Sequence, residues 1–384
     1  MTRLSKHVFS SVVLTSALVA NLALATNKCY ILAMSSGQEQ AAYQAGVLKG
    51  LASKLTTEEL SYQAVSGIAG GAVNAAILSG HSNTQINEAI DKMIKFWTDG
   101  VKAKLYQNWW GGVIAGLFTA GGIYDNSPLT QFLQTQFNDP QTFERDLSIG
   151  LVDSIEGQYK SFQNKDFTKT QDLRDILFAS FASPGYFPPA DVLGSKWFDG
   201  SAVYDIDIFT AVNKCFDKGF IEENIVVDLI MTSSANLKEV NATEYHTMGM
   251  LFRYLEISSF YSSMDGLLRA KFSYPKANFR YAISPSKALP SSSYPLNLDE
   301  KQMNDTIQQG IEDAIAAINQ GSGQSVDHLI HYHLLKSQND DRIDNLTYGG
   351  FMEAKANGDY DFQAFDVSSI TSDPSYIKYQ LNIE

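Results

Sequence analysis

The sequence predicts an α/β fold in which helices cover both faces of a mostly parallel sheet. Short apolar segments alternate along the chain with segments whose apolar residues recur at helical spacing, and such alternation is typical of parallel strands joined by crossover helices. Hydrophobic residues make up 44% of the 384 residues, enough for one core of about 250 to 300 residues plus an appendage. The segments expected to form strands are Tyr30–Met34, the stretch beginning near Tyr62, Leu147–Asp153, Lys196–Phe198, Ile225–Met231 and Phe279–Ile283.

The first expected strand leads into a small polar loop. Residues 30–34 are apolar and are followed by Ser35–Gln40, after which Val47, Leu48 and Leu51 recur at helical spacing. A loop of small residues between a strand and a helix can direct backbone N–H groups at an oxyanion. This loop is therefore a candidate oxyanion hole.

Residues 62–76, YQAVSGIAGGAVNAA, read as a strand that turns through small residues into a helix. A nucleophile elbow needs small residues two positions before and two after the reacting residue, and Gly67 and Gly71 stand at those positions. A helix starting near Gly70 would also direct its free N–H groups at a developing negative charge. The central residue is Ala69, which has no hydroxyl. An ordinary tight turn is the alternative interpretation, and Ser66 is expected to be a structural hydroxyl.

The segment ASFASPGYFPPADVLGSKWFDGSAVYDID places an acid at the end of a short strand. A helix end and a proline-rich turn precede Lys196–Phe198, and Asp199 and Gly200 follow. An acid in this position can be reached from a neighbouring strand. A carboxylate that only caps a nearby turn is the alternative.

In this order, the three segments resemble the patatin-like phospholipases. The family's oxyanion loop and following helix correspond to SSGQEQAAYQAGVL, and its elbow corresponds to GIAGGAVNA from Gly67 to Ala75. Its proline-rich segment and acid motif correspond to residues 179–189 and 199–201. The resemblance covers about residues 28 to 320 and implies a three-layer α/β/α fold.

The resemblance also implies a chemistry, namely hydrolysis of lipid acyl esters by a Ser/Asp dyad without histidine or cofactor. Ala69 takes the nucleophile position, and Asp199 takes that of the acid that serves as general base. The oxyanion-hole positions are Ser36, Gly37 and Gln38. The ligand expected on this basis is a lipid or acyl ester.

Several positions depart from the family's pattern. Besides Ala69, the family's glycines are replaced by Ser36, Gln38 and Ala41, and Gln40 stands where Arg or Lys is usual. Further departures are Ser201 for glycine or alanine, and Asp205 and Asp207 for Asn and Pro. Loss of a serine nucleophile costs about a million-fold in rate in the best studied case, so we expect an inactive homologue that binds lipid. The alternative is an active phospholipase A-type hydrolase whose serine has been changed to Ala69.

The chain divides into three expected regions. Residues 1–25 have the basic start, apolar centre and small-residue end of a signal peptide, with cleavage near Ala25, so we expect an extracellular or lumenal protein. An uncleaved anchor is the alternative. Residues 26–320 form the phospholipase-like domain, and 321–384 are an extension of unknown role. Three sequons, at Asn241, Asn304 and Asn345, are candidate glycosylation sites.

Cys29 and Cys215 are the only cysteines, and they allow either one disulfide or two buried thiols. The sequence leaves this choice open.

The net charge of −13 argues against nucleic acid as a partner and requires any membrane contact to be apolar and local. Candidates for such a contact are the segments 109–118 and Met250–Leu268, although both are also compatible with core helices. The histidines of DHLIHYHLL meet no fixed metal-site spacing, so we expect a polar helix and no metal. No particular protein partner is indicated.

A packing helix is expected near residue 300. Asn297 and Glu300 have the spacing of a capping box, and an apolar stripe follows at helical spacing from Met303 to Ile318.

Overall fold

The strands form one eight-stranded mixed sheet in the order β5-β6-β3-β2-β1-β7-β8, with β4 also paired to β3. The structure is a computed structural model that describes residues 28–140, 142–233, 246–290 and 295–337. Neighbours from β3 through β2, β1 and β7 to β8 are parallel, while β4, β5 and β6 run antiparallel to their partners. The strands are β1 Cys29–Met34, β2 Tyr62–Ile68, β3 Asp146–Asp153, β4 Tyr159–Gln163, β5 Ala190–Val192, β6 Ser195–Asp199, β7 Ile225–Ile230 and β8 Asn278–Ile283.

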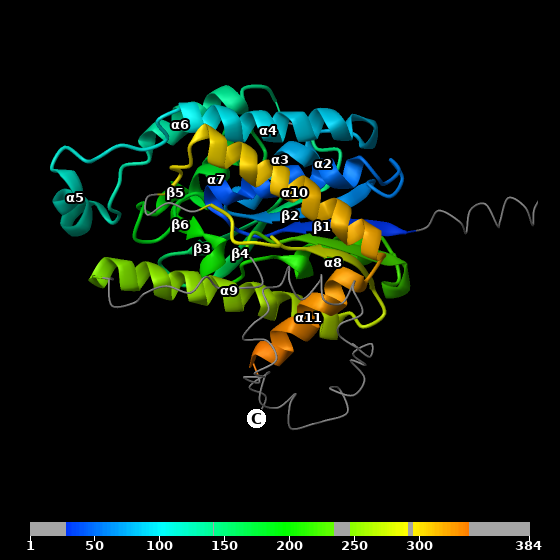
Figure 1. Ribbon diagram of the computed structural model, residues 1–384. Helices are drawn as coiled ribbons and strands as arrows, with labels where there is room; N and C mark the ends of the chain where they lie inside the picture. Colours follow the sequence, from blue (N-terminus) through cyan, green and yellow to red (C-terminus); the bar gives the residue numbers. More distant parts are fainter. Residues whose placement is uncertain (1–27, 141, 234–245, 291–294, 338–384) are drawn as a thin grey trace, which may run out of the picture.

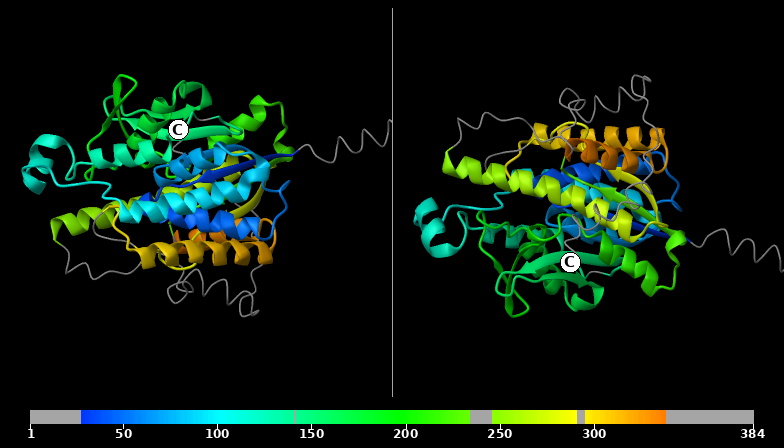
Figure 2. Two further views of the ribbon diagram at one scale, coloured as in Figure 1. Left: turned by 90° about the horizontal axis from the view of Figure 1, so that it is seen from above. Right: turned by 90° about the horizontal axis from the view of Figure 1, so that it is seen from below.

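Helices cover both faces of this sheet, which confirms the predicted α/β architecture (Figure 1). One layer contains α2 Ala42–Ala52, α3 Gly70–Ser79, α4 Ile86–Lys102, α6 Ser127–Gln136, α7 Thr170–Ser180 and α10 Glu300–Gln320. The other contains α8 Ile208–Asp217, α9 Thr247–Ser273 and α11 Gln324–Ser337. The short helix α5, Gly112–Ala115, projects away from both layers in every view (Figures 1 and 2).

Each face of the sheet has its own hydrophobic core. Along β1, Leu32 and Met34 join the cluster under α2, α3, α4 and α10. Ile31 and Ala33 join the cluster under α8, α9 and α11. Successive strand residues point to opposite faces, so a strand buried on both sides must be apolar throughout. This explains why the central strands could be recognised in the sequence.

Some elements differ from the expectations. The short antiparallel strands β4 and β5 were not predicted, because their sequences lack an apolar run. The predicted capping box at Asn297 is wrong, since α10 is capped by Asp299, whose carboxylate accepts a hydrogen bond from the Gln302 N–H at 2.7 Å.

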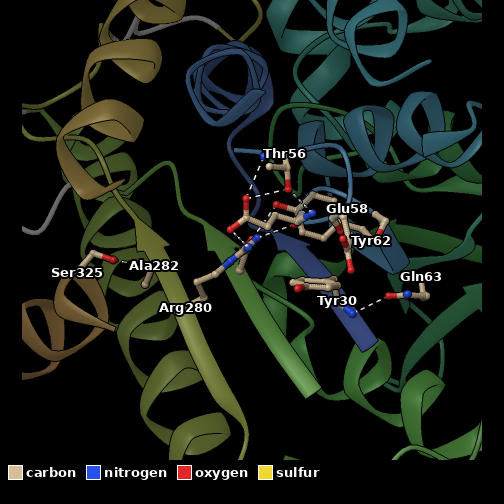
Figure 3. A network of polar contacts seen from close by, with 11 residues as sticks. Tyr30, Thr56, Glu58, Tyr62, Gln63, Arg280, Ala282 and Ser325 are labelled. Carbon is tan, nitrogen blue, oxygen red and sulfur yellow. Dashed lines mark hydrogen bonds and ion pairs between the residues drawn. The ribbon is translucent and has the colours of Figure 1, made fainter. Parts of the chain in front are cut away.

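Part of the expected C-terminal extension packs onto the domain. Helix α11 contacts β8 and α9, and the Ser325 hydroxyl accepts a hydrogen bond from the Ala282 N–H at 3.0 Å (Figure 3). The expected boundary at residue 320 therefore lies between two helices, α10 and α11, that contact each other.

A buried ion pair holds β7 and β8 together, away from the C-terminal end of β2. The Arg280 guanidinium contacts the Asp228 carboxylate, which also accepts a hydrogen bond from the Tyr62 hydroxyl at 2.7 Å (Figure 3). Burial alone would lower the pKa of Arg280, but the ion pair with Asp228 raises it above its ordinary value. The pairing of β2 with β1 skips Gln63, and that of β8 with β7 skips Arg280. Extra residues of this kind, called β-bulges, change the direction of their side chains.

Cys29 and Cys215 form a disulfide between the start of β1 and α8, separated by 186 residues in the sequence. This settles the choice that the sequence left open. Cross-linking two distant residues lowers the entropy of the unfolded chain, and the effect grows with the length of the closed loop.

Reducing this disulfide should lower the free energy of unfolding by roughly 3 to 5 kcal/mol. Urea unfolding with and without reductant measures the change. The Cys29→Ala/Cys215→Ala variant should match the reduced protein and should not respond to reductant. An unchanged urea midpoint after confirmed reduction of both thiols would contradict the stabilising role.

Candidate active site

Ala69 forms a strained turn between β2 and α3. Its backbone has φ 49° and ψ −122°, a conformation that residues other than glycine rarely adopt. Its side chain is completely buried. This strand-to-helix turn has the form of a nucleophile elbow, which aims the central side chain away from both flanking elements. The structure therefore builds the expected elbow around a methyl group.

The glycines on either side of Ala69 are required by close backbone contacts. A Cβ atom on Gly67 would lie 2.2 Å from the Gly71 carbonyl oxygen, and one on Gly71 would lie 2.4 Å from the Ser35 carbonyl oxygen. No side chain fits at such distances, because Cβ atoms do not approach other atoms this closely. These contacts also bring the end of β1 against the elbow.

Asp199 lies directly beyond the elbow along the same edge of β3. Ile68, the last residue of β2, pairs with Gly150, and the next residue of β3, Leu151, pairs with Asp199 of β6. Strand β4 pairs with both Gly150 and Leu151, so it must occupy the opposite edge. Strands β2 and β6 therefore share one edge of β3, and their ends at Ala69 and Asp199 face each other. The strand pairing brings the two positions of the expected dyad together.

Asp199 is a buried acid whose pKa is strongly shifted. Its side chain is 3% exposed, and burial raises its pKa to about 7. Two hydrogen bonds oppose this shift, from the Ser201 N–H to Oδ1 and from the Ser201 hydroxyl to Oδ2, each at 2.9 Å. The nearby carboxylate of Asp205 raises the pKa further. A carboxyl that titrates near neutral pH suits a general base.

The loop after β1 contains free N–H groups next to the start of α3. Within the described residues, the N–H groups of Gly37 and Gln38 have no hydrogen-bond acceptor, as an oxyanion hole requires. The Gln38 carbonyl lies against Gly70, where a Cβ atom would come within 2.3 Å of its oxygen. The Ser36 N–H is different, because it donates to the Asp205 carbonyl at 2.9 Å. Of the three expected oxyanion-hole residues, Ser36 has its N–H bound to Asp205, whereas the N–H groups of Gly37 and Gln38 find no acceptor in the described part of the chain.

Gln38 has a conformation in this loop that normally favours glycine. Its φ is 47°, in the left-handed region, which glycine adopts without steric cost. This explains why the patatin-like phospholipases that the sequence resembles have glycine at this position. Its side-chain amide is buried, and neither the nitrogen nor the oxygen has a hydrogen-bond partner among the described residues. The substitution therefore adds backbone strain and an unsatisfied polar group to the candidate oxyanion hole.

Glu39 lines a small apolar pocket behind the loop. The pocket has a volume of about 20 Å³, and its walls include Phe96, Trp97, Leu105, Phe181, Leu298 and Met303. Burial raises the pKa of Glu39, whose carboxylate accepts a hydrogen bond from the Leu296 N–H at 3.0 Å. This volume holds about one water molecule and no acyl chain. An acyl chain that entered here would have to displace the lining side chains.

In the sequence, Asp205 stood out only because it replaces the asparagine that is usual in patatin-like phospholipases. In the structure it is the centre of a cluster of hydrogen-bonded serines beside the site. It is 1% exposed and accepts hydrogen bonds from the hydroxyls of Ser36 and Ser263, and from that of Ser259 at 3.3 Å. Burial raises its pKa, and the serine hydroxyls oppose that shift. The cluster ties the loop after β1 to α9. No local motif could have revealed it, because its members lie far apart in the sequence.

The remaining candidates are placed as follows. The Ser66 hydroxyl donates to the Asp207 carbonyl at 2.6 Å, which confirms its structural role. Asn304 is exposed on α10, whereas Asn241, Asn345 and the expected signal peptide lie outside the described residues. His328 and its neighbours belong to α11, and no group of three or more possible metal ligands occurs in the described parts of the chain.

The two segments considered for lipid contact differ in burial. Residues 110–118, named here the apolar arm, expose Trp110, Val113, Ile114, Leu117 and Phe118, so this segment is not a core helix. Helix α9 exposes Met250, Leu251, Tyr254 and Leu255 in its first half and buries Met264 and Leu267 in its second. In the described ranges of the chain, no helix is long and apolar enough to span a membrane.

Fold and site together define an α/β protein with a hydrolase-type elbow. Residues 32–212, which contain the loop after β1, the elbow and Asp199, match the family model for patatin-like phospholipases. This part of the chain is therefore similar to the patatin-like phospholipases. A solved structure of VipD from Legionella pneumophila is similar with a TM-score of 0.39 and 12% identity, over 93% of this chain and 80% of that one. At these values the likeness carries no functional information. None of the curated proteins compared with the chain matches it significantly.

Proposed function

We propose that this protein is a patatin-like phospholipase homologue that binds lipid acyl esters without hydrolysing them. The observation that carries the proposal is the elbow, which is fully formed next to a buried acid and has only the methyl group of Ala69 at its centre. An acyl-enzyme intermediate needs a nucleophilic atom at this point. The free N–H groups of Gly37 and Gln38 can still bind the carbonyl oxygen of an ester.

The state of the surrounding site supports loss of hydrolysis beyond Ala69. Gln38 strains the loop, and the Ser36 N–H is already bound to Asp205. Each change weakens the stabilisation of an oxyanion, which is commonly the largest single contribution to catalysis. A hydrolase disabled by one replaced serine would be expected to keep the rest of its oxyanion hole intact.

The two surfaces that expose apolar side chains support contact with a lipid surface. The apolar arm and the first half of α9 project from the same end of the molecule (Figures 1 and 2). An exposed cluster that includes Trp110 and Phe118 is typical of membrane or partner contact sites. Because the chain carries a net charge of −13, we propose a zwitterionic bilayer as the partner.

We also propose that the protein enters the secretory pathway. Residues 1–25 have the pattern of a signal peptide, and the disulfide between Cys29 and Cys215 is the kind of bond that persists in oxidising compartments. Fractionation of cells and medium with an antibody to the mature chain tests the proposal.

The protein comprising residues 26–384 should bind phosphatidylcholine vesicles and release no fatty acid from them, because Ala69 supplies no nucleophile. Vesicle flotation measures binding, and titration of released acid measures hydrolysis. The Ala69→Ser variant is the matched comparison, and a gain of hydrolysis would show that Asp199 and the loop remain competent. Hydrolysis by the unaltered chain, or failure of that chain to bind vesicles, would contradict the proposed function.

The Ile114→Asp substitution should weaken vesicle binding about tenfold, because it places a charge on the apolar surface expected to enter the bilayer. Ile221→Asp is the matched control. Ile221 is also exposed, but it lies before the start of β7, at the end of the parallel strands opposite to the apolar arm. Both variants should keep the unfolding temperature of the parent. Equal loss of binding in the two variants would contradict the assignment of this face.

A further inference from the structure

Each oxygen of the Asp199 carboxylate accepts one hydrogen bond from a residue of its own turn. Its Oδ1 accepts the Ser201 N–H, and its Oδ2 accepts the Ser201 hydroxyl, both at 2.9 Å. Asp199 is buried, whereas Ser201 is half-buried. The resemblance to patatin-like phospholipases places glycine or alanine at position 201, and neither could supply the second of these bonds.

A buried carboxylate needs donors, because an unsatisfied buried acceptor is costly. In a Ser/Asp dyad, the hydroxyl of the elbow residue is one such donor, and the same hydrogen bond activates the nucleophile. Ala69 cannot donate, and the strand pairing leaves Asp199 facing it. Ser201 provides a hydroxyl in place of the absent one.

We propose that Ser201 is a positioning residue that holds Asp199 toward its own turn and competes with any nucleophile at position 69. Hydrolytic competence of this site then depends on residue 201 as well as on residue 69. The inference rests on the proposed function, since it concerns the same site. It explains how a buried acid can remain in place without the hydroxyl that it would otherwise activate.

The competition concerns a defined proton transfer. In the Ala69→Ser variant, the introduced oxygen would attack the ester carbonyl carbon while its proton passes to Asp199. The carbonyl oxygen takes the negative charge, and the ester C–O bond then breaks as the leaving alkoxide recovers the proton from Asp199. Water reverses these steps on the acyl-enzyme and releases the acid. A hydroxyl of Ser201 that already donates to Asp199 reduces the fraction of Asp199 oriented to accept the first proton.

The test compares hydrolysis of p-nitrophenyl butyrate by four proteins: the unaltered chain, Ser201→Ala, Ala69→Ser and the double variant. The assay is run at pH 9, where Asp199 is ionised. There, kcat/KM of the double variant should exceed that of Ala69→Ser by about tenfold, because about the free energy of one hydrogen bond is needed to separate Asp199 from the Ser201 hydroxyl. The unaltered chain and Ser201→Ala should be inactive.

The pH profile gives a second measurement that a purely structural role would not change. The hydrogen bond from the Ser201 hydroxyl lowers the pKa of Asp199. Ser201→Ala removes that bond and keeps the one from the backbone N–H, so the pKa of Asp199 should rise. A general base works in its ionised form, and the acidic limb of kcat/KM should therefore move to higher pH in the double variant than in Ala69→Ser.

Ser195→Ala in the Ala69→Ser background is the matched control. The Ser195 hydroxyl donates to Asp153 at 2.7 Å, a similar Ser–Asp hydrogen bond at the other end of β6, and its loss should change neither kcat/KM nor the pH limb. Ser201→Gly repeats the test if Ser201→Ala unfolds.

Equal kcat/KM and equal pH limbs in Ala69→Ser and the double variant would overturn the inference, and so would inactivity of both. Hydrolysis by the unaltered chain that is lost in Ser201→Ala would also overturn it, because Ser201 would then be a nucleophile itself. Failure of the unaltered chain to bind vesicles would contradict the proposed function and leave this inference untouched. Equal kcat/KM and equal pH limbs in the two variants would overturn this inference and leave the proposed function untouched, so the two failures are distinguishable.

Discussion

The left-handed turn at Ala69 is the constraint on which the rest of the site depends. A residue with φ 49° between a central strand and a helix brings the backbone of the strand end very close to that of the helix start. Gly67 and Gly71 make this close contact possible because they have no side chain. A conformation of this kind costs of order 1 to 3 kcal/mol and persists only when the surroundings enforce it. Here the enforcement comes from β2, α3 and the end of β1, all completely buried around the turn.

The strand pairing of the sheet places an acid, Asp199, next to the elbow. Strands β2 and β6 meet end to end along one edge of β3, so Asp199 faces the turn without any long loop having to close over the site. The polar cluster around Asp205 then ties the loop after β1 to α9. By contrast, the Arg280–Asp228 ion pair joins β7 and β8 away from this region. The described chain thus places a buried acid beside a strand-to-helix turn whose central side chain is the methyl group of Ala69.

The sequence predicted the parts of this structure that local patterns determine. The central strands could be recognised because they are buried on both faces, and the elbow because Gly67 and Gly71 must stand at fixed distances from Ala69. The antiparallel β4 and β5 were missed because short, partly polar strands have no distinctive pattern. The bond of Ser36 to Asp205 and the disulfide depend on contacts across the fold. Chain spacing alone does not encode such contacts.

The most direct test of the central claim is the stability of Ala69→Gly compared with that of Ala72→Gly, measured by urea unfolding. Glycine adopts positive φ without steric cost, so Ala69→Gly should raise the free energy of unfolding by about 0.5 to 1 kcal/mol. Ala72 lies in the first turns of α3 and is equally buried, so its replacement should lower that free energy by about 1 kcal/mol or more. A rise in the free energy of unfolding for Ala69→Gly together with a fall for Ala72→Gly would support a strained elbow at Ala69. Destabilisation of similar size by both substitutions would contradict it.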